Sequence, residues 1–181
     1  LEGMSYDKRI GKEFMNAGVG FGGSCFPKDL LGLISHAKKN GYKPILLKAT
    51  YKVNLTQPLR LLNIAEKYDI KNKKVSVLGL AFKEGTDDVR ESPSFKLIDG
   101  LLKKKISVVV YDPVAMKNAK KVLKNKVAYA KSLGDALRQT DLCFIMTDWN
   151  EFKNKKLYKD KIVLDGKNIF RKNENYEGIC W

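Results

Sequence analysis

The chain has 181 residues, 44% of them apolar, so it can bury one good hydrophobic core or two modest ones. Lys and Arg exceed Asp and Glu by 15, but the lysines occur in runs typical of solvated helix surfaces, and no recognition-helix or RNP-like pattern accompanies them. No apolar run is long enough to span a bilayer and no signal-peptide core is present. We therefore expect a soluble, cytoplasmic protein that binds neither nucleic acid nor membrane.

The three cysteines, Cys25, Cys143 and Cys180, have spacings that fit neither a disulfide framework nor a zinc site. We expect reduced thiols and no metal. Within the apolar segment "DLCFIMTD", Cys143 has the surroundings of a core residue.

The first seventy residues predict three helices, over 5–17, 26–41 and 44–69. The first has Ser5 as a candidate cap and places Ile10, Phe14 and Ala17 at helical spacing. The second has Pro27 in its first turn and ends at Asn40-Gly41. The third has an apolar stripe that Pro58 should kink or divide.

From Lys73 onward, apolar β-rich runs alternate with helical segments. Strands are predicted over 74–82, 106–113, 127–130, 141–148 and 161–166, and helices after Ser92-Pro93, after residue 113 and over 133–140. Continuous apolar strands in this alternation are typical of a parallel, doubly wound sheet. The predicted fold is therefore α/β, with a helical central segment over 1–70 and a Rossmann-like domain over 71–181.

The stretch "GVGFGGSC" places Gly18, Gly20 and Gly23 in G-x-G-x-x-G spacing. The preceding "KEFMNA" consists of helix formers rather than a buried strand, so the dinucleotide fingerprint fails its context test. The strand-to-loop junction at 77–86 carries only Gly79 and Gly85. No part of the chain is expected to hold NAD by itself, and the glycines serve either a flexible connector or a backbone that a phosphate or sugar can approach.

Cys25 stands at or beside the start of the second helix, where the helix dipole and Lys28 favour a thiolate while the charge of Asp29 opposes it. A lone cysteine is more often a small buried apolar residue than a nucleophile. A cysteine hydrolase that pairs Cys25 with His36, the one histidine, is an alternative, but the two lie too far apart along one helix to contact directly.

The segment "GVGFGGSCFPKD" closely resembles the catalytic-cysteine segment of the UDP-glucose 6-dehydrogenase family. "VLGLAFKEGTDDVRESPS" resembles the opening of that family's UDP-binding domain, and "YDP" at 111–113 matches its next strand end. The resemblance implies oxidation of UDP-glucose to UDP-glucuronate with two NAD, through a thiohemiacetal and a thioester on Cys25. Asp29 would orient water or assist proton transfer.

The resemblance also implies a substrate site, wrapped by the backbone from Asn16 to Gly22. Its residues would be Arg9, Phe14, Asn16, Ala17, Gly18, Val19, Gly20, Phe21, Gly22, Phe82, Lys83 and Lys167. Arg9 would reach the neighbouring subunit's site in a homodimer formed through the helical segment. Lys167 departs from the family's usual arginine after "DG", keeping the charge but losing the bidentate fork. Lys28 and Arg90 would approach NAD.

The family's N-terminal NAD-binding domain and its catalytic lysine and asparagine cannot be assigned in this sequence. The chain is expected to be a C-terminal portion of such an enzyme, inactive alone, with NAD bound mainly by the absent domain. Alternatives that stay open are a GDP-mannose or other nucleotide-sugar 6-dehydrogenase, and a UDP-sugar-binding module without catalysis.

Overall fold

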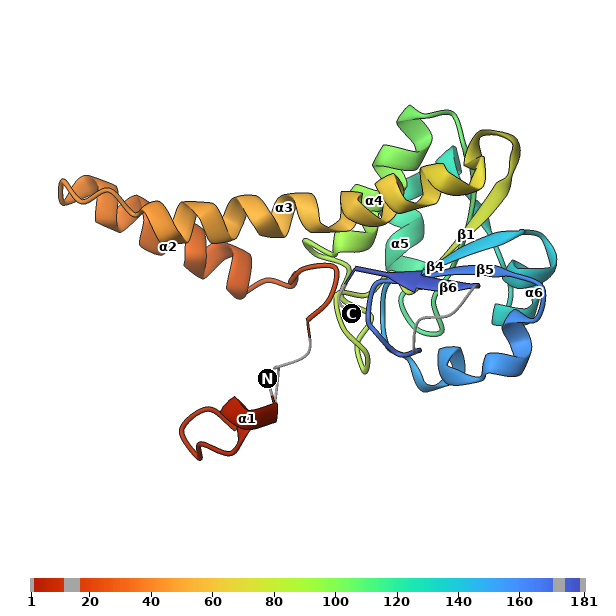
Figure 1. The fold of residues 1–181 in the computed structure, drawn as a ribbon. Coiled ribbons are helices and arrows are strands. Elements are labelled where there is room, and N and C mark those ends of the chain that lie inside the picture. Colours follow the sequence, from red (N-terminus) through yellow and green to blue (C-terminus); the bar gives the residue numbers. More distant parts are fainter. Residues whose placement is uncertain (1, 12–16, 171–174, 180–181) are drawn as a thin grey trace.

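A six-stranded parallel sheet forms the centre of the computed structural model, which describes residues 2–11, 17–170 and 175–179 (Figure 1). The strand order is β3-β2-β1-β4-β5-β6. The strands are β1 (Lys74–Leu78), β2 (Ser107–Tyr111), β3 (Ala128–Tyr129), β4 (Leu142–Ile145), β5 (Ile162–Asp165) and β6 (Tyr176–Gly178). This order is that of a doubly wound Rossmann-type sheet, which confirms the predicted fold class.

The strand order reverses beside β1, which pairs with β2 on one side and with β4 on the other. Val75 is in register with Val108 and with Leu142. In sheets of this kind, ligands bind outside the carboxyl ends of the strands at this switch point. The loops that follow β1, β4 and β5 are therefore the expected place for a ligand.

Helices cover both faces of the sheet, as a parallel sheet requires. One face packs against α3 (Ile45–Ala65), α4 (Pro93–Lys103) and α5 (Met116–Leu123). The other face packs against α6 (Leu133–Arg138) and the short helices η4 (Asn150–Lys153) and η5 (Lys155–Tyr158). The remaining described helices are α1 (Glu2–Ser5), α2 (Phe26–Lys39), η1 (Glu66–Tyr68), η2 (Ile70–Asn72) and η3 (Lys124–Lys126).

The hydrophobic core contains residues from both sides of the boundary expected at residue 70. Leu61 and Ala65 of α3 are fully buried in the same cluster as Val77 of β1. The two helices α3 and α4 approach closely because Gly100 leaves room for Leu62, whose Cδ2 would lie 2.9 Å from a Cβ at that position. The inner half of α3 is thus part of the α/β domain's core.

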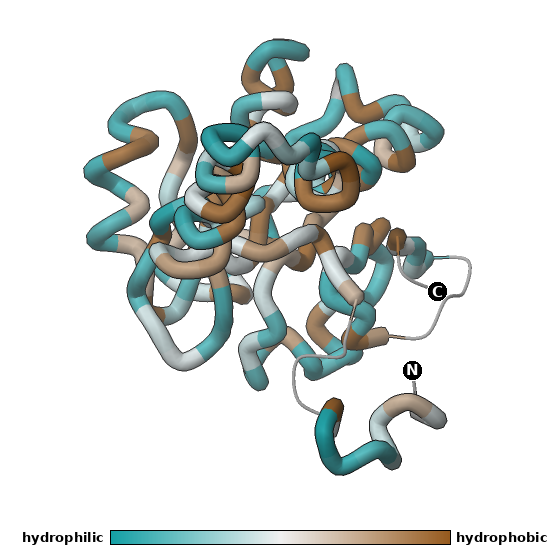
Figure 2. The backbone as a smooth tube through the Cα atoms, turned by 90° about the vertical axis from the view of Figure 1, so that its left-hand side faces the viewer, coloured by the Kyte–Doolittle hydropathy of each residue, from teal (hydrophilic) through white to brown (hydrophobic). Residues whose placement is uncertain are grey.

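The outer half of α3 and the whole of α2 form an arm that projects from the sheet (Figure 1). Figure 2, viewed along this arm, shows hydrophobic residues on its helices. Several of their large apolar residues are exposed: Phe26, Leu31, Leu33, Ile45, Leu46 and Val53.

The helix predicted over 5–17 is wrong in the described residues. The first helix, α1, ends at Ser5, so that residue does not cap a helix that follows it, and residues 6–10 form turns and a bend. Asp7 accepts hydrogen bonds from both the amide and the guanidinium of Arg9, and Gly11 has a φ of 72°. Local bonds from an aspartate compete with helix formation, and a positive φ interrupts it.

Two further expectations need adjustment. Pro58 does not divide the third helix, because α3 continues through it from Ile45 to Ala65. The sheet gains a sixth strand, β6, which has only three residues and gives little sequence signal. The second helix, by contrast, is confirmed, with Pro27 in its first turn and Gly41 beyond its end at a φ of 74°. None of the described helices is long and apolar enough to cross a membrane.

Candidate active site

Residues 17–24 form the glycine loop, which is attached at one end to the carboxyl end of β5. A Cβ built on Gly18 would lie 3.1 Å from the carbonyl oxygen of Gly166, the first residue after β5. Val19 is only 2% exposed and packs against Gly166, which also contacts Leu61 of α3. Val19 therefore anchors the loop in the core.

Two amide side chains on α3 hold the middle of the glycine loop. The Oδ1 of Asn54 accepts a hydrogen bond from the amide of Phe21 at 2.7 Å, and its Nδ2 donates to the carbonyl of Phe21 at 3.0 Å. The Nε2 of Gln57 donates to the carbonyl of Gly18 at 3.3 Å. The loop is thus fixed by side chains that lie more than thirty residues further along the chain.

The last two glycines of the loop pack against the segment that follows β1. A Cβ on Gly22 would collide with the backbone of Glu91, and one on Gly23 would lie 2.9 Å from the ring of Phe82. The amide of Gly23 donates to the carbonyl of Arg90 at 2.9 Å. Residues that are distant in the sequence therefore meet at this loop.

These contacts explain the glycine spacing. Gly20 and Gly23 have φ values of 110° and 82°, which side chains rarely tolerate, and Gly20 lies against Asn54. Ala17, the residue before Gly18, lies in irregular chain rather than in a strand, and the loop leads into α2. The glycines allow close packing of the backbone, and the expected failure of the dinucleotide fingerprint agrees with this geometry.

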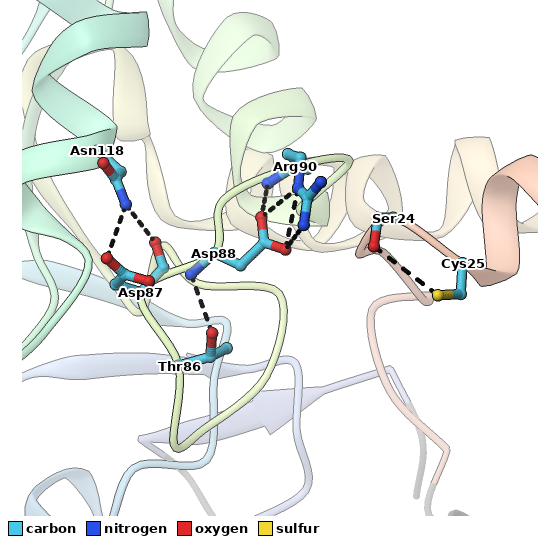
Figure 3. A network of polar contacts seen from close by, with 7 residues as sticks. All are labelled: Ser24, Cys25, Thr86, Asp87, Asp88, Arg90 and Asn118. Atoms are coloured by element: carbon cyan, nitrogen blue, oxygen red, sulfur yellow. Dashed lines mark hydrogen bonds and ion pairs between the residues drawn. The ribbon is translucent and has the colours of Figure 1, made fainter.

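Cys25 is exposed at the N-cap position of α2, directly after the glycine loop. Its side chain makes no capping hydrogen bond, and its Sγ lies 3.8 Å from the Oγ of Ser24 (Figure 3). The thiol is therefore accessible at the positive end of a helix of fourteen residues. Cys143, in contrast, is fully buried in β4, and burial raises the pKa of its thiol well above the ordinary value.

Asp29 lies one helical turn after Cys25, and its amide donates to the carbonyl of Cys25 at 2.8 Å. The Asp29 side chain is 67% exposed, and its Oδ1 lies 3.7 Å from the ammonium of Lys28, which is 78% exposed. A pocket of about 330 Å³ lies beside Asp29, lined by apolar side chains of the loop and of α2: Phe21, Phe26, Leu30 and Leu33.

Arg90 joins the segment after β1 to the neighbourhood of Cys25. Its guanidinium binds the carboxylate of Asp88 through Nε at 3.0 Å and Nη2 at 2.7 Å (Figure 3). The pKa of Asp88 is lowered chiefly by this hydrogen bond, and the pKa of Arg90 is raised chiefly by the same pair, with a smaller contribution from Cys25. On the other side of the segment, Nδ2 of Asn118 on α5 donates to Oδ2 of Asp87 at 2.9 Å. These bonds give the segment a fixed shape.

Phe82 and Lys83 follow the end of β1. Phe82 is half-buried under Gly23, whereas Lys83 is exposed with its ammonium 5.8 Å from the centroid of the Phe82 ring. Lys167, after β5, has a side chain that is 25% exposed, and its ammonium lies 3.4 Å from Oδ1 of Asp148 after β4. A Cβ on Gly18 would lie 3.9 Å from the same ammonium, so Lys167 borders the loop.

The remaining predicted residues are placed differently. Arg9 is 88% exposed and pairs with Asp7 on the N-terminal segment, which Figure 1 shows apart from the sheet. Phe14 and Asn16 lie outside the described residues. His36 lies in the last turn of α2, far from Cys25, with its Nε2 3.3 Å from Nδ2 of Asn40. Among the described residues, no group of three or more His, Cys, Asp or Glu could hold a metal ion.

Residues 76–172 match the UDP-binding domain of the UDP-glucose/GDP-mannose dehydrogenase family, and residues 1–56 match its central domain. The chain belongs to this family. It is 44% identical over 186 residues to UDP-glucose 6-dehydrogenase AglM of Haloferax volcanii, covering 99% of this chain and 43% of the relative. UDP-glucose 6-dehydrogenase TuaD of Bacillus subtilis is 39% identical, over 96% of this chain and 39% of its own length.

The solved structure of a UDP-glucose dehydrogenase from the hyperthermophilic archaeon Pyrobaculum islandicum superposes with a TM-score of 0.92 at 38% identity. The superposition covers 99% of this chain and 42% of the archaeal one. This chain therefore spans between 39% and 43% of the length of these dehydrogenases. It corresponds to their central and UDP-binding domains.

Dehydrogenases of this family use NAD, but the Rossmann-type crevice of this chain does not fit a dinucleotide. Asp112 follows β2, where NAD-binding domains use an acidic residue on the ribose. Here Asp112 is fully buried, and its carboxylate accepts bonds from the amides of Leu80 and Ala115 and from the indole of Trp149, among others. The hollow beside it, about 720 Å³, is lined in part by two carboxylates, Glu84 and Glu151.

Sequence reasoning missed three residues that shape this candidate site. Asn54 and Gln57 lie within the long apolar pattern of α3. Two amide side chains one turn apart, just before Pro58, were the available sequence signal for a polar contact there. Asp148 precedes Trp149 and pairs with Lys167, and its position as the last residue of the strand predicted over 141–148 was the corresponding signal.

Proposed function

We propose that this chain is the part of a UDP-glucose 6-dehydrogenase that grips the nucleotide sugar and supplies the cysteine nucleophile. The observation that carries the proposal is the exposed thiol of Cys25 directly after a clamped glycine loop, with Phe82 and Lys167 beside that loop. Two of the most similar relatives are UDP-glucose 6-dehydrogenases, which favours UDP-glucose over another nucleotide sugar.

The exposed backbone of the glycine loop is the proposed contact for the sugar and the diphosphate. Val19 and Gly22 are buried as anchors, so Ala17, Gly18 and Gly20 present the surface that a ligand reaches. Amides in irregular, glycine-rich backbone suit anionic oxygens. Lys167 adds a positive charge at the edge of the loop, and Lys83 adds another beyond Phe82.

Cys25 is proposed to act as the thiolate that adds to the sugar aldehyde after the first oxidation, forming a thiohemiacetal. The second oxidation gives a thioester, which water then hydrolyses to the carboxylate while the sulfur leaves as thiolate. Asp29, on the same side of α2 one turn later, orients the water or accepts its proton. NAD, when bound, supplies the hydride acceptor for both oxidations.

NAD is proposed to bind mainly to a domain outside this chain, because the crevice beside Asp112 does not fit it. Lys28 and Arg90 are exposed cations near Cys25 and are the residues of this chain proposed to approach the cofactor. The chain alone should therefore bind a UDP-sugar without reducing NAD. A free thiol as nucleophile also supports the reducing cytoplasm as the site of action.

The exposed apolar residues of the arm are proposed to pack against a second copy of the chain. Scattered apolar residues are ordinary on surfaces, but Ile45 and Leu46 are about three-quarters exposed side by side at the start of α3. Arg9, which projects from the N-terminal segment, is proposed to reach the partner's site in that dimer. Light scattering should give the mass of a dimer, and Leu46→Glu should shift it toward the monomer.

Isothermal titration calorimetry of the chain with UDP, UDP-glucose, GDP-mannose and NAD tests the proposal. We expect binding of UDP and UDP-glucose, weaker binding of GDP-mannose and none of NAD. Preference for GDP-mannose would reassign the substrate within the family. A longer enzyme that joins this chain to an NAD-binding domain provides a second test. If it binds UDP-glucose and keeps its turnover without Cys25, this chain is better described as a UDP-sugar-binding module that takes no part in catalysis. Absence of heat with both uridine ligands would overturn the proposal.

A further inference from the structure

Asn54 and Gln57 are the polar side chains through which α3 holds the glycine loop. The side-chain amide of Asn54 pairs with both backbone groups of Phe21, at 2.7 Å and 3.0 Å, in the manner of two neighbouring strands. Gln57, three residues later on the same side of the helix, donates to the carbonyl of Gly18. Together they attach two points of the loop to one helix.

Asn54 lies where one backbone hydrogen bond of helix α3 is missing. Pro58 has no amide hydrogen, so the carbonyl of Asn54 lacks the helical donor that residue 58 would otherwise provide. Gly20 packs at this point: a Cβ there would lie 3.2 Å from the Asn54 carbonyl oxygen and 2.6 Å from its Oδ1. The proline, the asparagine and the glycine therefore form one complementary contact.

The hydrogen bonds from Asn54 also fix the direction in which the loop runs toward Cys25. With its backbone held by Asn54, Phe21 places its ring 5.8 Å from that of Phe26 in an edge-to-face contact. Phe26 is the first residue of α2 and follows Cys25. Asn54 thus lies at the start of a chain of contacts that ends at the proposed nucleophile.

We propose that Asn54, assisted by Gln57, is a positioning residue that sets the glycine-loop backbone for the nucleotide sugar. The inference rests on the proposed function, because it assigns the loop as the ligand contact. Neither side chain needs to touch the ligand. Their role is to keep the carbonyl and amide groups between Gly18 and Phe21 in one conformation, so that binding does not have to order them.

The experiment compares Asn54→Asp with Asn63→Asp, the same substitution at an exposed asparagine on the same helix. The carboxylate introduced by Asn54→Asp would keep the shape of the side chain, but it would replace the donor to the Phe21 carbonyl with an oxygen. The repulsion between these two oxygens should detach the loop from α3 and break the bond to the Phe21 amide as well. Hydrogen exchange should accelerate at the Phe21 amide while the β1 and β4 amides stay protected. UDP-glucose affinity, measured by calorimetry, should fall about tenfold or more. Asn63→Asp should change neither quantity.

Gln57→Met repeats the test without adding a charge near the diphosphate. It removes one hydrogen bond to the loop, together with the exposed bond that Arg60 donates to the Gln57 Oε1. It therefore keeps the test decisive if Asn54→Asp fails to fold. We expect a severalfold loss of UDP-glucose affinity with an unchanged unfolding midpoint. If the unsubstituted chain binds UDP-glucose and both variants bind it with the same affinity, this inference is overturned while the proposed function stands. Absence of binding by the unsubstituted chain would overturn the proposed function, and this inference with it.

Discussion

Gly22 lies directly against the backbone carbonyl of Glu91, leaving no room for a side chain at residue 22. Glu91 itself has a φ of 51°, a conformation that a residue with a side chain rarely adopts. This contact joins the glycine loop to the segment between β1 and α4.

Gly22→Ala should therefore destabilise the chain by about 1–3 kcal/mol, because the methyl group must displace one of the two backbones. Gly32→Ala is the matched control. Gly32 lies within α2 with nothing within 4 Å of an added Cβ, so alanine there should leave stability unchanged or raise it by up to about 1 kcal/mol. Urea unfolding of both variants measures the difference, and equal stability would contradict this packing.

Cys25 should react rapidly with iodoacetamide in the folded chain, whereas Cys143 should react only after unfolding. The first is exposed at a helix N-terminus, and the second is fully buried with a raised pKa. Mass spectrometry of tryptic peptides in a Cys180→Ser background separates the two thiols. Equal labelling rates in the folded state would refute the assigned environments.

In a longer enzyme that joins this chain to an NAD-binding domain, Cys25→Ser should lower overall turnover by several orders of magnitude. The reason is that a serine hydroxyl at neutral pH is a much weaker nucleophile than a thiolate. The variant should still bind UDP-glucose with nearly unchanged affinity. Steady-state NADH formation and calorimetry measure the two effects. Cys143→Ser is the comparison, and turnover of Cys25→Ser at the unsubstituted rate would exclude the nucleophile role.

Lys167→Met should weaken UDP-glucose binding about tenfold, because it removes a partly desolvated positive charge beside Gly18. Lys167→Arg should preserve or strengthen binding, since the guanidinium offers two donors to an anion. Lys131→Met, at an exposed position before α6, should have no effect. Calorimetric titration of the three variants decides whether Lys167 contacts the ligand.

The Asp88–Arg90 pair should make the segment after β1 sensitive to acid. Arg90 lowers the pKa of Asp88 in the folded state, so the carboxylate stabilises the fold above its unfolded pKa. That contribution is lost as the pH falls through the lowered folded value. Carbon-13 NMR of the Asp88 carboxyl should show a pKa below the usual aspartate value, and Arg90→Gln should raise it.

Lys103→Gln is the control for this titration, because Lys103 pairs with Asp99 on the exposed side of α4. It should leave the pKa of Asp88 unchanged. An Asp88 carboxyl that titrates at the ordinary aspartate value in the unsubstituted chain would show that the ion pair does not persist in solution.

The sheet and α2 were predictable because their signals are local. Apolar runs such as that around Val109 define buried parallel strands, and Pro27 and Gly41 mark the ends of α2. The doubly wound architecture followed from the alternation of strands and helices rather than from any single residue. The place of Cys25 at a helix start was also predictable from local signals, whereas its proposed role as a nucleophile came from the family resemblance.

The rest of the site depends on contacts that local patterns do not encode. The bonds between Phe21 and Asn54 cross 33 positions of the chain, and the contact between Gly22 and Glu91 crosses more. The first predicted helix failed because periodicity cannot detect the competing turn made by Asp7 and Arg9. Long-range packing decided these features.

The pairing of β1 with both β2 and β4 has a consequence for synthesis on the ribosome. Val75 can pair with Val108 as soon as β2 has been made, but its other neighbour, Leu142, emerges only after α5, η3, β3 and α6 have followed β2. Until then β1 presents an open, apolar edge to the cell, the kind of surface on which nascent chains aggregate. Translation that pauses before β4 prolongs this exposure, whereas arrival of β4 closes the edge from within the same molecule.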